Sequence, residues 1–288
     1  MLPPRSDIGK GANGPQRARN AGPFPGQESL ASGPMDSRLQ WTSEEDFTLD
    51  GVGYASMARN AASDRLSIFK ARPAIEEYEA LVRATSPQTI LELGIFGGGS
   101  TALLAQLASP TKLVAVEINE ARLSVLDAFI DQRGLGQIVS AYYGVNQADT
   151  ARLTEIVQHE FAGAALDLVI DDASHLIDET RTSFNALFPH LRPGGTYVIE
   201  DWSWPHRSYV FPNPIYRAVT PISAFALELA LVAACDDTVI TDVTLRRGTA
   251  LVRRGPAALD GRDFSVTTYL DDVGIQMVDA LASTRTPS

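Results

Sequence analysis

Two carboxylates and a histidine follow directly on a buried apolar run near the middle of the chain. LDLVID (166–171) reads as a core strand, and it is followed by Asp172 and, three residues later, by His175. A later apolar run, TYVIE, ends in Glu200 and is followed by Asp201. Carboxylate oxygens are ligands of Mg²⁺ or Mn²⁺, and a histidine can act as a general base near neutral pH. These residue types could therefore combine a divalent cation with removal of a proton.

A glycine-rich loop lies earlier in the chain, in ILELGIFGGGST. Glu92 ends a predicted strand, and the glycines from Gly94 onward form a turn into a helix that starts near Ser100. Glycines permit positive φ and close approach of a ligand, and a helix N-terminus offers free N–H groups, so we expect a small ligand here. The loop departs from the dinucleotide fingerprint G-x-G-x-x-G, because Phe96 stands two positions after Gly94.

An acidic residue, Glu117, ends the next predicted strand, about twenty residues beyond the glycine loop. A carboxylate at this place can accept hydrogen bonds from both hydroxyls of a ribose, which S-adenosylmethionine (SAM) and NAD share. A surface glutamate at a strand end is the alternative. Asn146, Gln147 and Asp149 follow the third strand and are further candidates for the adenine side of the pocket.

Strands and helices alternate from about residue 71 onward, which predicts how these residues are positioned. The expected strands are TILEL, LVAVEI, QIVSAYY, LDLVID, TYVIE, TVITDVTLRR and GTALVRR, and the expected helices include residues 71–84, 119–132, 149–161, 178–191 and 221–235. Parallel neighbours need crossover connections, so the pattern predicts an α/β, Rossmann-like, doubly wound sheet. The sheet is expected to be mostly parallel, with seven strands and a C-terminal antiparallel hairpin.

Composition narrows the possible partners. The chain has 288 residues, of which 44% are hydrophobic and 20% charged, and its net charge is −11 at pH 7. Nucleic acid is not an expected partner, because binding to phosphates relies on clustered Lys and Arg. The single cysteine, Cys235, cannot form an internal disulfide, and we predict a cytoplasmic, reducing compartment. The most apolar stretch, residues 222–235, is too short to span a membrane comfortably and is interpreted as a buried or dimer-forming helix.

The quoted motifs resemble those of a known enzyme family. Glu92, Gly94, Gly98 and Ser100 form E-x-G-x-x-x-G-x-S, which resembles motif I of class I SAM-dependent methyltransferases. IDDASH, TSFNALFPHLRPGG and YVIEDW narrow the resemblance to the metal-dependent sugar O-methyltransferases of macrolide and polysaccharide biosynthesis. The similarity covers roughly residues 85–205 and is strongest over 167–202.

The resemblance implies a role for each candidate residue. The strands that end at Asp171 and Glu200 would be neighbours about 5 Å apart, so their carboxylates would converge and call for a cation. It implies that His175 is the general base and that Asp172 assists it. The implied ligands of Mg²⁺ or Mn²⁺ are Asp172, Glu200 and Asp201, and the implied SAM-binding residues are Glu92, Gly94, Gly98, Ser100, Thr101, Glu117, Asn146 and Asp171. Asp171 and Asp172 could exchange roles. A further ligand from the N-terminal region or a neighbouring subunit, which the family can use, is not located in this sequence.

Several structural alternatives stay open at this point. His175 could instead cap the helix that follows it, although Asp178 is the better candidate for that cap. His206 and a set of aromatic residues could line an acceptor pocket or simply pack as loop side chains; the aromatic residues are Trp202, Trp204, Tyr209, Phe211 and Tyr216. His159 and His190 are expected on helix surfaces.

The predicted function is methyl transfer from SAM to a sugar hydroxyl of a small molecule or glycan. The alternatives are a metal-dependent O-methyltransferase of a phenol, a SAM-binding enzyme that does not methylate, and an NAD-dependent oxidoreductase, which ranks last because its glycine pattern is missing. The expected organisation is a flexible tail (1–40), an arm or lid (41–70) and a methyltransferase domain (71–280). The resemblance also favours a homo-oligomer, with no membrane partner.

Overall fold

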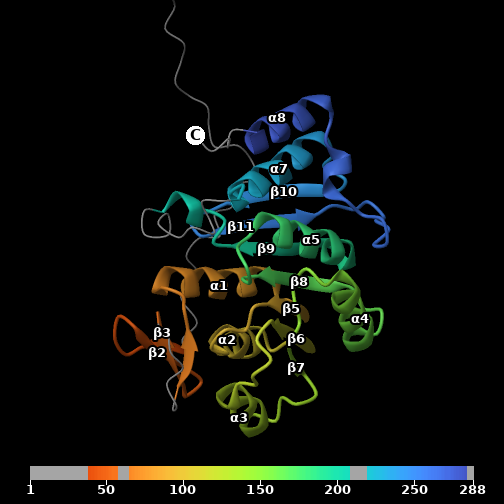
Figure 1. Ribbon diagram of the computed structural model, residues 1–288. Coiled ribbons are helices and arrows are strands. Elements are labelled where there is room, and N and C mark those ends of the chain that lie inside the picture. The colour runs from red at the N-terminus through yellow and green to blue at the C-terminus, as the bar shows by residue number, and fades with distance from the viewer. Residues whose placement is uncertain (1–37, 58–64, 208–218, 284–288) are drawn as a thin grey trace, which may run out of the picture. The chain divides into compact units, whose positions relative to one another are not determined.

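The computed structural model describes residues 38–57, 65–207 and 219–283, the side chains of the last three excepted. Within these residues a seven-stranded sheet carries helices on both faces (Figure 1). The strand order is β10-β11-β9-β8-β5-β6-β7. The strands are β5 (Thr89–Leu93), β6 (Lys112–Glu117), β7 (Val139–Tyr143), β8 (Leu166–Asp171), β9 (Leu191–Glu200), β10 (Ile240–Leu245) and β11 (Thr249–Arg254).

Strand directions confirm the predicted fold class. The five strands β9, β8, β5, β6 and β7 run parallel to one another, whereas β11 is antiparallel to both β9 and β10. The last two strands thus form the expected C-terminal hairpin. The register pairs Leu93 with Asp171 and Asp171 with Ile199, so the carboxyl ends of β5, β8 and β9 lie at one edge. Ligands of open α/β sheets bind at that edge.

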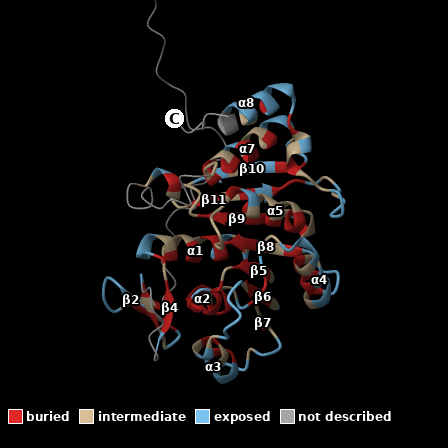
Figure 2. Cartoon of the chain, viewed as in Figure 1, coloured by how far each residue is buried: buried red, intermediate tan, exposed pale blue. Residues whose placement is uncertain are grey.

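Successive residues of each central strand enter different apolar cores, because side chains alternate between the two faces of a sheet. Leu91 and Val114 pack into a core with α4 (Thr150–Phe161), α5 (Ile177–Leu187) and α7 (Ile222–Cys235). Ile90 and Leu113 pack on the opposite face with α1 (Arg72–Thr85), α2 (Gly99–Ala108) and α3 (Ser124–Gln132). The strands are accordingly buried along most of their length (Figure 2).

A second sheet precedes the large one. Its order is β1-β2-β3-β4, and the strands are β1 (Leu39–Trp41), β2 (Asp46–Leu49), β3 (Val52–Ser56) and β4 (Leu66–Ile68). Strand β4 contacts the start of α2 closely: a Cβ atom on Gly99 would lie 2.4 Å from the carbonyl oxygen of Ser67. This contact brings Phe69 and Lys70, which follow β4, to the carboxyl edge of the large sheet. The predicted tail lies almost wholly outside the described residues, and the domain boundaries stay a prediction.

Some predicted boundaries differ from the structure. The helix expected over 119–132 begins only at Ser124, because a loop follows β6. The helix after β8 begins at Ile177 with Leu176 at its N-cap, so neither His175 nor Asp178 caps it and the Asp178 prediction was wrong. The remaining elements are short 3-10 helices and a C-terminal helix: η1 (Phe188–His190), η2 (Trp204–His206), η3 (Val266–Tyr269) and α8 (Asp272–Ser283).

Helix α7 is the apolar 222–235 segment, and it is buried by packing. Its residues Phe225, Leu229 and Val232 are fully buried, and they belong to the core that α4 and α5 also form. None of the described helices is both long and apolar enough to cross a membrane.

Candidate active site

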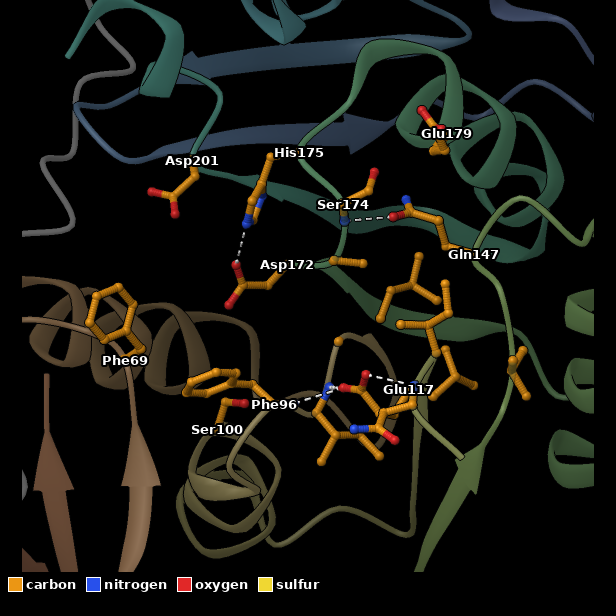
Figure 3. Close-up of a pocket in the computed structure, with 18 of the residues that line it drawn as sticks. Phe69, Phe96, Ser100, Glu117, Gln147, Asp172, Ser174, His175, Glu179 and Asp201 are labelled. Atoms are coloured by element: carbon orange, nitrogen blue, oxygen red, sulfur yellow. Dashed lines mark hydrogen bonds and ion pairs between the residues drawn. The ribbon is translucent and has the colours of Figure 1, made fainter. Parts of the chain in front are cut away.

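A cavity of about 920 Å³ opens at the carboxyl edge of the large sheet (Figure 3). Its volume lies within the range of about 300–1,000 Å³ that small-molecule sites occupy. Seven of the predicted site residues line it: Gly94, Ser100, Glu117, Asn146, Asp172, His175 and Asp201. Five others do not line it: Glu92, Gly98, Thr101, Asp171 and Glu200. The cavity thus joins the glycine-loop side of the predicted site to its acidic side.

The glycine loop is in backbone contact with the loop that follows β8. Gly94 has φ of +96°, and a Cβ atom on it would lie 2.3 Å from the carbonyl oxygen of Asp172. The Asp172 N–H in turn donates to the carbonyl of Leu93 at 2.9 Å. Glycine is therefore required at position 94 both for its conformation and for this approach.

Glu117 holds the glycine loop through main-chain contacts. Its Oε2 accepts from the N–H groups of Ile95 and Phe96 at 3.1 and 2.9 Å, and its Oε1 accepts from Asn119 at 3.0 Å (Figure 3). The carboxylate lines the cavity at the end of β6, where the sequence predicted a ribose acceptor. It can thus shape the loop and face a ligand with its remaining lone pairs.

Glu92 lies behind the loop. It is fully buried, and its Oε2 accepts a hydrogen bond of 2.6 Å from the hydroxyl of Thr101 in the first turn of α2. Burial raises the pKa of Glu92 to about 7. This pair ties β5 to α2 beneath the cavity.

Asp171 and Asp172 face different surroundings. Asp171 is buried and accepts hydrogen bonds from Ser183, Tyr197 and Gln147, so it is turned toward the α5 side of the sheet. Burial raises its pKa to about 6. Asp172, the next residue along, lines the cavity.

Of the three polar candidates after β7, only Asn146 and Gln147 lie at the cavity. Gln147 is buried, and its Oε1 accepts from the Ser174 N–H at 2.7 Å, which holds the loop between Asp172 and His175 (Figure 3). Asp149 instead caps α4, where it accepts from the Arg152 N–H at 3.0 Å.

The His175 ring and the Asp172 carboxylate point toward one another, and Asp201 lies beside them at the same end of the cavity (Figure 3). Each offers one ligand atom, and these three atoms lie within 4.8 Å of one another. His175 Nε2 lies 3.9 Å from Asp172 Oδ1, and the imidazole ring packs against Trp204 with 4.5 Å between ring centroids. Two carboxylates and an imidazole in this arrangement suit a divalent cation or a proton transfer.

A lysine from outside the predicted site joins the acidic cluster. Lys70 Nζ donates to Asp172 Oδ2 at 2.6 Å and to Glu200 Oε2 at 2.5 Å. The other Glu200 oxygen accepts from the Tyr78 hydroxyl on α1. Glu200 thereby faces Lys70 and Tyr78.

Electrostatics in the cluster follow from burial and from neighbouring charges. Burial, with the charges of Asp172 and Glu200, raises the pKa of Asp201 to about 7. Burial also raises the pKa of Glu200, against the opposing effect of Lys70. Burial lowers the pKa of His175 from its ordinary value, although Asp172 opposes this, so the imidazole is neutral at pH 7.

Left-handed backbone conformations gather at the cavity. Of the eight non-glycine residues with positive φ among those described, three line it: Phe96 at +50°, His175 at +57° and Asp201 at +53°. Such conformations cost energy and persist where the surrounding structure holds them, often at functional sites.

The prediction that aromatic residues line an acceptor pocket can be compared with the structure for only some of these residues. Trp204 lines the cavity, and Trp202 donates its indole N–H to the carbonyl of Arg246. His206 bonds to the Ser223 hydroxyl at 2.8 Å. Tyr209, Phe211 and Tyr216 lie outside the described residues. His159 is exposed as expected, whereas His190 is half-buried.

The sequence reasoning missed Lys70 and Tyr78. Lys70 follows a three-residue strand that carries no motif, and Tyr78 lies within α1, where the pattern predicts a helix and nothing marks a site. The available signal was the excess of carboxylates at the strand ends, which called for a positive charge without saying which residue provides it.

Known proteins resemble the region that holds this cavity. Residues 91–202 match the family model of a methyltransferase domain. The mycinamicin VI 2''-O-methyltransferase of Micromonospora griseorubida is 67% identical over 42 residues, which are 14% of this chain and 10% of that protein. The L-olivosyl-oleandolide 3-O-methyltransferase of Streptomyces antibioticus is 36% identical over 126 residues, which are 43% of this chain and 31% of that protein.

A solved structure with a similar chain is the MycE methyltransferase of the mycinamycin biosynthetic pathway, in complex with Mg, SAH and mycinamycin VI. It shares 27% identity, the TM-score is 0.48, and the match covers 62% of this chain and 48% of that one. The chain spans less than a third of the length of the two curated relatives named above. The predicted resemblance to class I SAM-dependent methyltransferases, and among them to sugar O-methyltransferases, is thereby confirmed for the domain that residues 91–202 contain.

Proposed function

We propose that this protein is a SAM-dependent O-methyltransferase that acts on a sugar hydroxyl of a small molecule or glycan, with a divalent cation and His175 as aids. The observation that carries the proposal is one cavity lined both by the glycine loop with Glu117 and by the cluster of Asp172, His175 and Asp201. A methyl donor and an activated oxygen must meet in this way for an in-line displacement.

SAM fits the glycine-loop half of the cavity. Gly94 and Ser100 lie at the turn into α2, where free N–H groups are available to a polar ligand, and Glu117 can accept from ribose hydroxyls. Asn146 lines the wall beyond Glu117, and we assign it to the adenine side. Glu92, Gly98 and Thr101 support the loop from behind.

The acidic half fits a divalent cation, because two carboxylates and an imidazole converge in one cavity without a thiolate. Asp172 and Asp201 are the residues that would hold Mg²⁺ or Mn²⁺. When bound, the ion would supply positive charge that stabilises a developing alkoxide. The position of Asp172 at the cavity, with Asp171 turned away, supports Asp172 as the ligand.

His175 is proposed as the general base. Its Nε2 lies at the cavity, 3.9 Å from Asp172, and its lowered pKa keeps it neutral at pH 7. As the acceptor oxygen bonds to the methyl carbon and the carbon–sulfur bond breaks, His175 takes the hydroxyl proton. Trp204 and the Asp172 carboxylate hold the ring for this transfer, and Asp172 also favours the resulting imidazolium.

A sugar is preferred over a phenol as acceptor for two reasons. The name of one relative, the L-olivosyl-oleandolide 3-O-methyltransferase, gives a sugar-bearing acceptor. A sugar hydroxyl also needs a stronger arrangement of base and cation than a phenol, whose proton leaves more readily. Lys70 does not offer the lysine base that phenol methylation commonly uses, because it is buried and bound to two carboxylates. Homo-oligomerisation stays a prediction.

The proposal is tested by calorimetric binding of S-adenosylhomocysteine (SAH), followed by methyl-transfer assays on a panel of glycosides and catechols. We expect SAH to bind and at least one glycoside to be methylated. Binding of SAH without methylation of any acceptor would favour the non-methylating alternative, and methylation restricted to catechols would favour the phenol alternative.

A further inference from the structure

Lys70 reaches the acidic cluster from a segment that lies outside the matched methyltransferase domain. It follows β4 of the small sheet, whereas its partner Asp172 begins the loop after β8 and its partner Glu200 ends β9 in the large sheet. Its side chain is only 5% exposed. A lysine this buried is held by its charge partners, because an unpaired buried ammonium is strongly unfavourable.

The contacts of Lys70 divide the carboxylates into two groups. Both carboxylate oxygens of Glu200 accept hydrogen bonds: Oε2 accepts from Lys70 and Oε1 accepts from Tyr78. Asp172 accepts a hydrogen bond from Lys70 at Oδ2, whereas its Oδ1 faces His175. Among the described residues, Asp201 makes no hydrogen bond or ion pair with Lys70 or Tyr78, and Arg207 Nη1 lies 3.9 Å from its Oδ1. The oxygens that can gather around a second cation are therefore those of Asp172 and Asp201.

The convergence of ligand atoms supports the same division. The described residues whose ligand atoms lie within 4.8 Å of one another are Asp172, His175 and Asp201, and Glu200 is not among them.

We propose that Lys70 is a resident cation of the acidic site, so that Glu200 is the partner of Lys70 and Tyr78, and a divalent ion uses Asp172 and Asp201 without Glu200. This inference rests on the metal site of the proposed function. It makes Lys70 a positioning residue, because it fixes Asp172 Oδ2 and leaves Oδ1 directed at the cavity. It also assigns a role in the site to the segment before α1.

The first test compares Mn²⁺ affinity, measured by calorimetry or by the electron paramagnetic resonance of free Mn²⁺, across the variants Lys70→Met, Glu200→Gln and the double variant. SAH affinity and melting temperature are measured alongside to verify folding. Lys70→Met removes a positive charge close to the ion and frees Glu200, so we expect Mn²⁺ to bind at least about tenfold more tightly. Glu200→Gln should weaken binding more in the Lys70→Met background than in the wild-type background.

An unchanged or weaker Mn²⁺ affinity of folded Lys70→Met would overturn the proposal, as would an equal effect of Glu200→Gln in both backgrounds.

The second test needs no variant: anomalous scattering from wild-type crystals grown with Mn²⁺ and SAH. We expect the ion against Asp172 and Asp201 with the Lys70–Glu200 pair intact. An ion bonded to Glu200, with Lys70 displaced, would overturn the Lys70 assignment alone. Binding of SAH with no Mn²⁺ binding in solution would overturn the metal site itself and this inference with it.

Discussion

Replacement of His175 by asparagine separates its proposed chemistry from its structural role. His175 has φ of +57°, and asparagine is among the few residues that adopt this left-handed conformation readily. Asparagine also keeps a polar side chain beside Asp172 but cannot take a proton at neutral pH. The variant therefore removes the base and retains the backbone.

The size of the effect follows from how enclosed the imidazole is. General-base catalysis contributes about 100- to 10,000-fold to a rate, or about 3 to 5 kcal/mol of transition-state stabilisation. The His175 side chain is only 12% exposed and packs against Trp204, so bulk water is poorly placed to replace it. We therefore expect kcat of His175→Asn to fall by at least about 100-fold.

The assay is the initial rate of methyl transfer at saturating SAM and Mg²⁺ across a range of pH. Because burial lowers the pKa of His175, the wild-type rate should be lost as pH falls below a midpoint under 6.5 and should be constant above it. The variant should lose this acid limb while its affinity for SAH is unchanged. His159→Asn, a change at an exposed helix position, serves as the matched control.

Retention of the wild-type kcat and of the acid limb by His175→Asn would show that His175 is not the general base. A loss of SAH binding in the variant would instead assign His175 a structural role in the loop.

Three further predictions concern the loop, the core and the metal. Gly94→Ala should abolish SAH binding, because the added Cβ would lie 2.3 Å from the carbonyl oxygen of Asp172. The control Gly136→Ala, with no atom within 4 Å of its Cβ, should bind SAH normally. Equal binding by both variants would contradict this prediction. Arg181→Leu should lower the free energy of unfolding in urea by about 2–3 kcal/mol, because the buried Glu228 carboxylate loses the Arg181 partner that lies 2.5 Å away. A change under about 1 kcal/mol would argue against a stabilising role for that ion pair. Burial raises the pKa of Asp201 to about 7, so protons should compete with Mn²⁺ and its affinity should fall as pH drops through 7; a pH-independent affinity would contradict a role for Asp201 as ligand.

The sequence predicts the parts of the fold that local patterns determine. TILEL and LDLVID coincide with β5 and β8, because apolar runs of five or six residues bounded by turns suit buried parallel strands. The start of α3 is less predictable, since the polar residues after β6 are compatible with a helix and only the packing of the loop decides against it. The N-cap of α5 falls on Leu176 for a similar reason.

Fewer features of the site than of the fold can be predicted from the sequence. Alternation along β8 implies that Asp171 and Asp172 face opposite directions, but the choice between them depends on the partners that Tyr197 and Ser183 provide to Asp171. Lys70 and Asp172 are 102 residues apart in sequence, and they meet only because the small sheet packs against α2. A contact made by tertiary packing leaves no local pattern to read.

We propose that this cavity transfers a methyl group from SAM to a sugar hydroxyl with the aid of a divalent cation. The most direct test of this proposal is the rate at which the wild-type protein methylates a glycoside acceptor, followed by mass spectrometry, in Mg²⁺, in excess EDTA, and after Mg²⁺ is restored. We expect the rate to be lost in EDTA and to return with Mg²⁺. A full rate in EDTA would contradict it.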